Sequence, residues 1–138
     1  MESHHIKFLV VHCSDTPNSE NLDANDIHKM HLDFGWDGIG YHKVILRNGD
    51  LVEGRPEYWQ GAHAYGYNDK SLGVCLIGRD HFNSEQFVTL ENLLDNWKLK
   101  YPNANIIGHR DITKSEKTCP NFDVKLWLKS RNKNEIKY

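Results

Sequence analysis

The amino-acid sequence predicts an α/β or α+β sandwich built around one β-sheet. Short apolar, β-branched runs alternate with stretches whose apolar residues recur every three or four positions, and an Asn-Gly turn joins two further strand-like segments. Strands and helices mixed in this way are typical of folds in which helices pack on a sheet. The chain has 138 residues, and a chain of this length buries enough apolar surface to fold alone. We expect one domain over residues 1–138, with its core at about residues 6–131.

The N-terminal part of the chain predicts a strand followed by an amphipathic helix. Residues 6–11 form a short apolar run, which is typical of a buried strand and delivers His12 to its C-terminal end. Asp23 is a suitable N-cap, and the helical pattern after it stops at Gly35. The apolar positions of this helix are Ile27, Met30 and Phe34.

The central part of the chain predicts a hairpin, a buried strand and a long helix. Residues 41–46 and 51–53 flank an Asn-Gly pair, which supplies the positive φ angles of a tight hairpin turn. Residues 72–77 form a further buried strand, and a helix begins with Ser84 as its cap. Its apolar face consists of Phe87, Leu90, Leu93, Leu94 and Trp97. A last short strand over residues 105–109 and a closing helix after Pro120 complete the pattern.

Composition and charge exclude several classes of protein. Seventeen Lys and Arg stand against 19 Asp and Glu, and a formal charge of −2 excludes the positive field of a general nucleic-acid binder. No stretch reaches membrane-spanning length, and the N-terminus lacks the features of a signal peptide. We expect a monomer made in the cytoplasm, with no nucleic-acid or membrane partner. In a reducing cytosol its three cysteines are thiols or metal ligands rather than disulfides.

Three segments combine metal-binding or catalytic residue types with predicted strand ends or loops. They are residues 11–14 (VHCS), 40–42 (GYH) and 108–120, which begin with GHRD and end with KTCP. A catalytic zinc takes three protein ligands of nitrogen and sulfur type and leaves one position for water. His12, His109 and Cys119 would make a complete set, although only the fold can bring residues so far apart in sequence together.

Several motifs in order resemble one known family. They are VVHCS, GWDGIGYHKVILRNGDLVEGR, QGAHAYGYNDKSLGVCLIG, and GHRD followed by KTCPNFDVKLWL. Together they cover almost the whole chain, which is far more specific than any one motif. The chain resembles the zinc-dependent N-acetylmuramoyl-L-alanine amidases, the family that includes bacteriophage T7 lysozyme and the peptidoglycan recognition proteins, and is most similar to the T7 type. The resemblance implies a central mixed sheet flanked by α-helices, with zinc in an open groove.

The resemblance also implies a role for individual residues. His12, His109 and Cys119 match the ligands of one Zn2+ ion per chain. Tyr41 and Lys117 match catalytic residues: Lys117 would mainly stabilise the oxyanion, and Tyr41 would orient or deprotonate the water, although these two roles could be exchanged. His63 matches a position that contacts substrate, with a hydrogen bond to the backbone as the alternative.

The implied reaction is hydrolysis of the lactyl amide between N-acetylmuramic acid and L-alanine in peptidoglycan. A phage endolysin, which acts on the cell wall after release, is the principal interpretation. A cytosolic amidase that recycles muropeptides and a non-catalytic peptidoglycan-binding module are the alternatives, and Cys119 argues against the second. A zinc nucleobase deaminase is excluded because the His-x-Glu and Pro-Cys-x-x-Cys motifs are absent.

The remaining conspicuous residues are interpreted as structural. Cys13 and Cys75 lie in apolar strand contexts and are expected to be buried thiols. His42 alternates with Tyr41 and is expected to face away from the site. Cleavage of sugars would require two carboxylates across the scissile bond, but nothing in the sequence directs Glu53 and Glu57 toward one substrate.

Overall fold

The sheet is mixed, and its antiparallel strand lies at one edge. The structure is a computed structural model and describes residues 5–19, 21–35, 38–113 and 119–136. Five strands lie in the order β3-β2-β4-β1-β5, and their bounds are β1 Phe8–Cys13, β2 Lys43–Ile45, β3 Leu51–Glu53, β4 Ser71–Leu76 and β5 Asn105–Gly108. Strand β1 pairs in parallel with β4 and β5, β2 pairs in parallel with β4, and β3 runs antiparallel to β2. The expected mixed sheet is confirmed.

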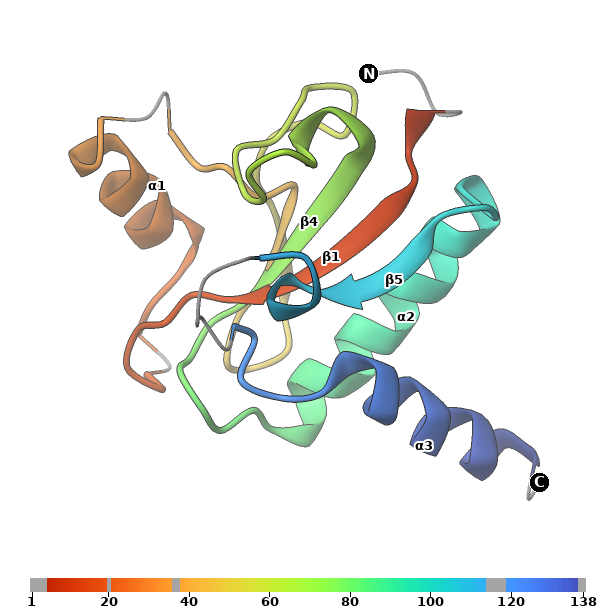
Figure 1. The fold of residues 1–138 in the computed structure, drawn as a ribbon. Coiled ribbons are helices and arrows are strands. Elements are labelled where there is room, and N and C mark those ends of the chain that lie inside the picture. The colour runs from red at the N-terminus through yellow and green to blue at the C-terminus, as the bar shows by residue number, and fades with distance from the viewer. Residues whose placement is uncertain (1–4, 20, 36–37, 114–118, 137–138) are drawn as a thin grey trace.

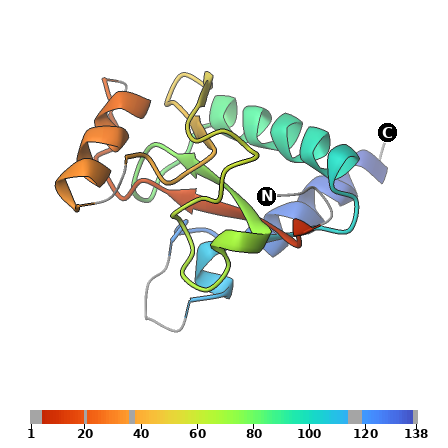
Figure 2. The same ribbon diagram turned by 90° about the horizontal axis from the view of Figure 1, so that it is seen from above.

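Helices cover the sheet from two sides. The α-helices are α1 Ala24–Asp33, α2 Ser84–Lys100 and α3 Val124–Ile136, and short 3-10 turns are η2 Asn68–Lys70 and η3 His109–Asp111. Helices α2 and α3 lie together on one side, and α1 lies on the other (Figure 1). Figure 2 shows the same separation from above. None of the helices in the described part of the chain is both long and apolar enough to cross a membrane.

The two faces of the sheet differ in what they bury. Alternate residues of β1 and β4, such as Leu9, Val11 and Val74, pack in a large apolar core with α2 and α3. Residues of α2 that complete it are Leu90, Leu93, Leu94 and Trp97. On the α1 side the fully buried apolar cluster is small and consists of Ile27, Val44 and Ile77. This second face leaves room for polar side chains.

Local sequence explains where the helices begin. The Asp23 side chain accepts a hydrogen bond from the Asp26 backbone N–H, and the Asp26 side chain accepts one from the Asp23 N–H, so the predicted cap of α1 is confirmed. The predicted Ser84 cap of α2 is wrong by one residue. Asn83 caps this helix because its side chain accepts from the Gln86 N–H while the Gln86 side chain accepts from the Asn83 N–H.

Candidate metal centre

Strand register brings two histidines side by side. Val11 of β1 pairs with Gly108 of β5 in parallel, so the next residues, His12 and His109, lie level at the C-terminal edge of the sheet. Their ring centroids are 4.5 Å apart. The carboxyl ends of parallel strands are a common place for binding sites in α/β sheets. Strand β1 extends to Cys13 and β5 ends at Gly108, so His12 lies within a strand and His109 begins the turn η3.

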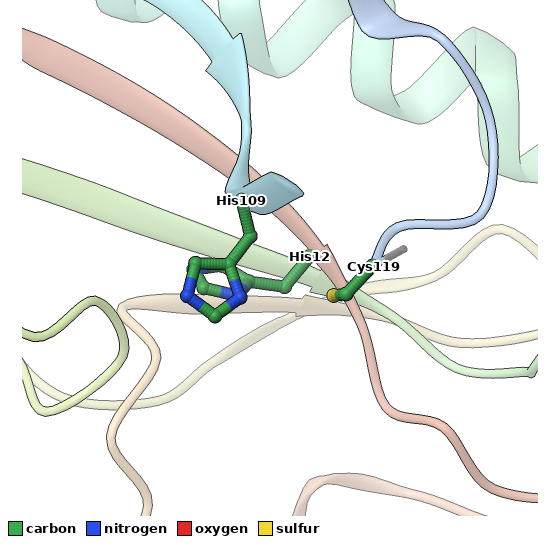
Figure 3. Close-up of side chains that lie close together, drawn as sticks. All are labelled: His12, His109 and Cys119. Carbon is green, nitrogen blue, oxygen red and sulfur yellow. The ribbon is translucent and has the colours of Figure 1, made fainter. Parts of the chain in front are cut away.

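The third residue, Cys119, is held against this edge by backbone hydrogen bonds. The Arg110 N–H donates to the Cys119 carbonyl at 2.7 Å, and the Cys13 N–H donates to the Cys119 Sγ at 3.1 Å. The Cys119 side chain comes from the segment that leads to α3 and points toward the two imidazoles (Figure 3). The sulfur of Cys13 lies 3.7 Å from that of Cys119.

The three side chains have the composition and spacing of a catalytic metal site. One ligand atom from each of His12, His109 and Cys119 lies within 4.8 Å of the other two. Tetrahedral zinc with bonds of about 2.0–2.3 Å would hold such atoms about 3.3–3.8 Å apart, so this spacing is compatible with one shared ion. Within the described part of the chain this group contains only three such residues, which leaves a fourth position for water or substrate.

The electrostatic surroundings keep His12 neutral. Burial, together with the neighbouring His63 and His109, lowers the pKa of His12 well below its usual value. A neutral imidazole offers the lone pair that a metal requires. The hydrogen bond with Cys13 and burial raise the pKa of the Cys119 thiol in the metal-free protein. A bound cation favours the thiolate and would reverse that preference.

Tyr41 lies beside the candidate metal site, whereas Lys117 lies outside the described residues. The Tyr41 ring centroid is 5.0 Å from that of His12. Burial raises the pKa of Tyr41 well above its usual value, so in the metal-free protein its hydroxyl stays protonated and can donate a hydrogen bond. Catalytic roles for Tyr41 and Lys117 stay predictions.

His63 lies inside the protein and contacts His12. The residue is only 9% exposed. The Nδ1 of His63 lies 2.9 Å from the Nε2 of His12, and its Nε2 lies 3.2 Å from the Ser71 hydroxyl. Burial, with His42 and His109 as further causes, lowers the pKa of His63 to about 3. Contact of His63 with substrate stays a prediction.

The expected orientation of His42 is wrong. Its ring lies on the site face, with its centroid 5.7 Å from that of His63. The Gly73 N–H donates to its Nδ1 at 3.1 Å, and its Nε2 lies 2.8 Å from the Trp59 carbonyl. Strand β2 begins only at Lys43, so strict alternation does not extend back to Tyr41. Ser71 was not predicted from the sequence; the signal that could have indicated it is a hydroxyl at the start of a fully buried strand.

The two carboxylates considered for sugar cleavage are engaged elsewhere. The Lys43 Nζ lies 2.6 Å from a Glu53 oxygen and 3.5 Å from a Glu57 oxygen. Lys43 neighbours Val44 on β2 and therefore points to the opposite face from the small apolar cluster. Both glutamates therefore form ion pairs with Lys43, and neither belongs to the candidate metal group.

A cavity of about 460 Å³ lies beside the N-terminal half of α1 and the chain that follows β3. Its lining includes Arg55 and Trp59 but none of the three candidate metal ligands. The metal group therefore lies outside this cavity, at the strand edge shown in Figure 3.

Comparison with known proteins gives a consistent result. A family profile described as N-acetylmuramoyl-L-alanine amidase matches residues 2–122. The endolysins of Enterobacteria phage T3 and Escherichia phage T7 are each 38% identical over 136 residues, which cover 93% of this chain and 87% of theirs.

Solved structures with the same fold include enzymes and recognition proteins. The amidase LysC from Clostridium intestinale has a TM-score of 0.82 and 26% identity, over 96% of this chain and 87% of its own. A point mutant of Drosophila PGRP-LB, solved in complex with tracheal cytotoxin, has a TM-score of 0.75 and 27% identity, over 86% of this chain and 76% of its own. The similarity therefore extends over nearly the whole sheet and its helices.

Proposed function

Because the chain belongs to the N-acetylmuramoyl-L-alanine amidase family, we propose that it cleaves peptidoglycan as a phage-type endolysin with one zinc ion per chain. The bond is the lactyl amide between N-acetylmuramic acid and L-alanine. The proposed zinc ligands are His12, His109 and Cys119. The observation that carries the proposal is the convergence of their ligand atoms to within 4.8 Å of one another.

The chemistry of an amide explains why a metal belongs in this site. An amide resists plain water, and a bound zinc supplies a water of lowered pKa together with a Lewis acid for the carbonyl. The protein holds the site ready: both histidines come from the edge of a rigid sheet, and the Cys13 N–H fixes the Cys119 sulfur at 3.1 Å. Little reorganisation is then required when the metal binds.

Two further residues are proposed to act on the substrate. The Tyr41 ring, 5.0 Å from that of His12, would place its hydroxyl near the attacking water or the scissile carbonyl. Lys117 would stabilise the oxyanion of the tetrahedral intermediate or protonate the leaving nitrogen. Its place two residues before Cys119 in the sequence supports this assignment.

The comparisons support peptidoglycan as the substrate. The T3 and T7 relatives are endolysins, and PGRP-LB has been solved with tracheal cytotoxin bound. We propose that the chain is made in the cytoplasm, acts on the cell wall after release, and works as a monomer. The alternative of a recycling amidase differs in its substrate, because such an enzyme prefers soluble muropeptides to intact wall.

The test is digestion of purified peptidoglycan with analysis of the new chain ends. We expect new α-amino groups on L-alanine and no new reducing sugars. A chelator should abolish the activity, added zinc should restore it, and Cys119→Ser should lack both bound zinc and activity. His81→Asn is a matched control, because the His81 side chain is 84% exposed on the loop after β4. Reducing ends that form in the presence of chelator would overturn the proposal.

A second digest separates the two amidase interpretations. Intact wall and soluble muropeptides are supplied at equal concentrations of the scissile bond, and release of stem peptide is followed by mass spectrometry. We expect faster release from intact wall. A strong preference for soluble muropeptides would favour the recycling enzyme while leaving the zinc chemistry in place.

A further inference from the structure

We propose that His63 and Ser71 are positioning residues, which fix the tautomer and the ring orientation of His12 through a chain of hydrogen bonds that ends on the Tyr67 carbonyl. The inference rests on the proposed role of His12 as a zinc ligand. It concerns two buried residues, one of which contacts the candidate ligand His12 while the other contacts the first. Partners of this kind commonly orient metal-bound histidines and strengthen metal binding.

The Ser71 hydroxyl determines which atoms donate and which accept in this chain of hydrogen bonds. The Ser71 hydroxyl donates its only hydrogen to the Tyr67 carbonyl at 2.7 Å. Its oxygen can then only accept from the His63 Nε2, which lies 3.2 Å away. The His63 ring must therefore carry its hydrogen on Nε2.

The position of the ring hydrogen on His63 in turn determines its position on His12. A neutral imidazole with its hydrogen on Nε2 has a bare Nδ1, which can only accept. The His63 Nδ1 lies 2.9 Å from the His12 Nε2, so His12 is the donor and carries its hydrogen on Nε2. The lone pair of the His12 Nδ1 is then available for the metal. The two rings meet edge to face, at 88° with centroids 5.0 Å apart, and this contact limits rotation of the His12 ring.

The surroundings of His63 hold its ring in a closely fitting space. The Asn68 side-chain oxygen accepts hydrogen bonds from the backbone N–H groups of His63 and Ala64, at 2.8 and 2.9 Å. A Cβ atom added at Gly73 would lie 2.7 Å from His63 Cγ and Nδ1, and one at Gly61 would lie 2.6 Å from its Cδ2. Glycine at both positions is therefore what gives the ring its place against His12.

His42 shows what a purely structural histidine looks like in the same region. It is fully buried, and its two ring nitrogens bond the backbone N–H of Gly73 and the carbonyl of Trp59. His63 differs because one of its nitrogens faces the candidate ligand His12. A substitution at His42 should therefore cost folding stability without a matching loss of zinc affinity.

The first experiment measures zinc affinity by competition with a chromophoric chelator, with thermal unfolding of each metal-free variant as the check on folding. We expect His63→Phe to bind zinc about 10–100-fold more weakly than the wild type. His63→Asn should recover much of the affinity, because its side-chain oxygen can replace Nδ1 as the acceptor. Ser71→Ala should give a smaller loss, and His42→Phe should bind zinc like the wild type.

The second experiment observes the tautomer directly in metal-free protein. The ¹⁵N chemical shifts of the His12 ring should report hydrogen on Nε2 in the wild type, and Ser71→Ala should weaken that preference. A His12 ring with hydrogen on Nδ1 would overturn the inference, as would a folded His63→Phe variant with wild-type zinc affinity. If His63→Phe does not fold, Ser71→Ala decides by the same two measurements.

The two proposals can fail separately. A wild-type protein that binds no zinc would remove the proposed metal role of His12 and with it the functional meaning of the chain of hydrogen bonds. A protein that binds zinc tightly but whose affinity is indifferent to His63 and Ser71 would leave the amidase mechanism intact and remove only the positioning role.

Discussion

The two faces of the sheet are built on opposite principles. Under α2 and α3 the buried side chains are apolar, such as Leu9, Val74 and Leu94. On the α1 side the same strands bury His12 and, with the chain around them, His42 and His63. Apolar burial stabilises the fold by about 25 cal/mol for each Å² removed from water. Burial of imidazoles stabilises little, because their nitrogens must be desolvated and then satisfied by hydrogen bonds.

The difference separates the part of the molecule that supplies stability from the part that supplies chemistry. The large core can lose a little packing without changing the site, because β1 connects the two faces only through alternate residues such as Val11 and His12. The histidine face is the reverse case. Substitutions of the candidate ligands there, and of His63 and Tyr41 beside them, should change metal binding or catalysis more than the free energy of unfolding. The following predictions test that separation.

The largest expected effect is on the apolar face. Leu94→Ala removes a fully buried side chain from the core under α2, and truncations of this kind cost about 2–5 kcal/mol. Denaturant unfolding should show this loss, while zinc affinity and turnover per folded molecule should stay near the wild-type values. Leu99→Ala on the same helix is the control, since Leu99 is 82% exposed. A folded Leu94→Ala protein that had lost zinc affinity would show that the faces are coupled.

Most of the fold could be predicted from local pattern. The apolar runs and the Asn-Gly turn indicate the strands, and the spacing of Leu90, Leu94 and Trp97 predicts the buried face of α2. What the pattern could not give is the strand order, because pairing of β1 with both β4 and β5 depends on contacts far apart in sequence. The ends of helices were predicted less accurately, since Asn83 rather than Ser84 caps α2.

The site could be predicted only as a set of residue types. The resemblance named His12, His109 and Cys119, and the structure brings them together, while their role as zinc ligands stays a prediction. The contacts behind them were not predictable, because His63 meets His12 across 51 positions of sequence. His42 was misplaced because alternation fails just before a strand begins.

The next effect concerns catalysis on the histidine face. Tyr41→Phe removes only a hydroxyl, and Lys117→Ala removes only a candidate oxyanion donor. Loss of one such donor costs about 10²–10³ in rate in other acyl-transfer enzymes. Both variants should bind zinc and unfold like the wild type while hydrolysing the amide far more slowly. Steady-state rates on a defined muropeptide, with zinc content measured on the same samples, check this expectation.

A mixed outcome would reassign the two roles. If Lys117→Ala hydrolyses the amide slowly and Tyr41→Phe hydrolyses it at the wild-type rate, then Tyr41 only packs against His12. The centroids of these two rings are 5.0 Å apart. Normal turnover in both variants would place the proton transfers on other residues. Lys125→Ala, in the first turn of α3, is the control for loss of a positive charge.

The smallest expected effect is a pH dependence of the free energy of unfolding, which should arise only from the histidine face. His63 has a folded pKa of about 3 because burial disfavours its charged form, whereas an unfolded histidine titrates near 6.5. Between these values the unfolded chain binds a proton that the folded chain does not, so stability is complete above about pH 6.5 and falls as the pH is lowered toward 3. One such residue costs about 1 kcal/mol between pH 7 and 5.5.

Denaturant unfolding of metal-free protein across this range should show the fall in stability. His63→Asn should reduce it by about that amount, whereas Leu94→Ala should lower the whole curve without changing its slope. An unchanged slope in folded His63→Asn protein would mean that His63 is not held neutral against His12.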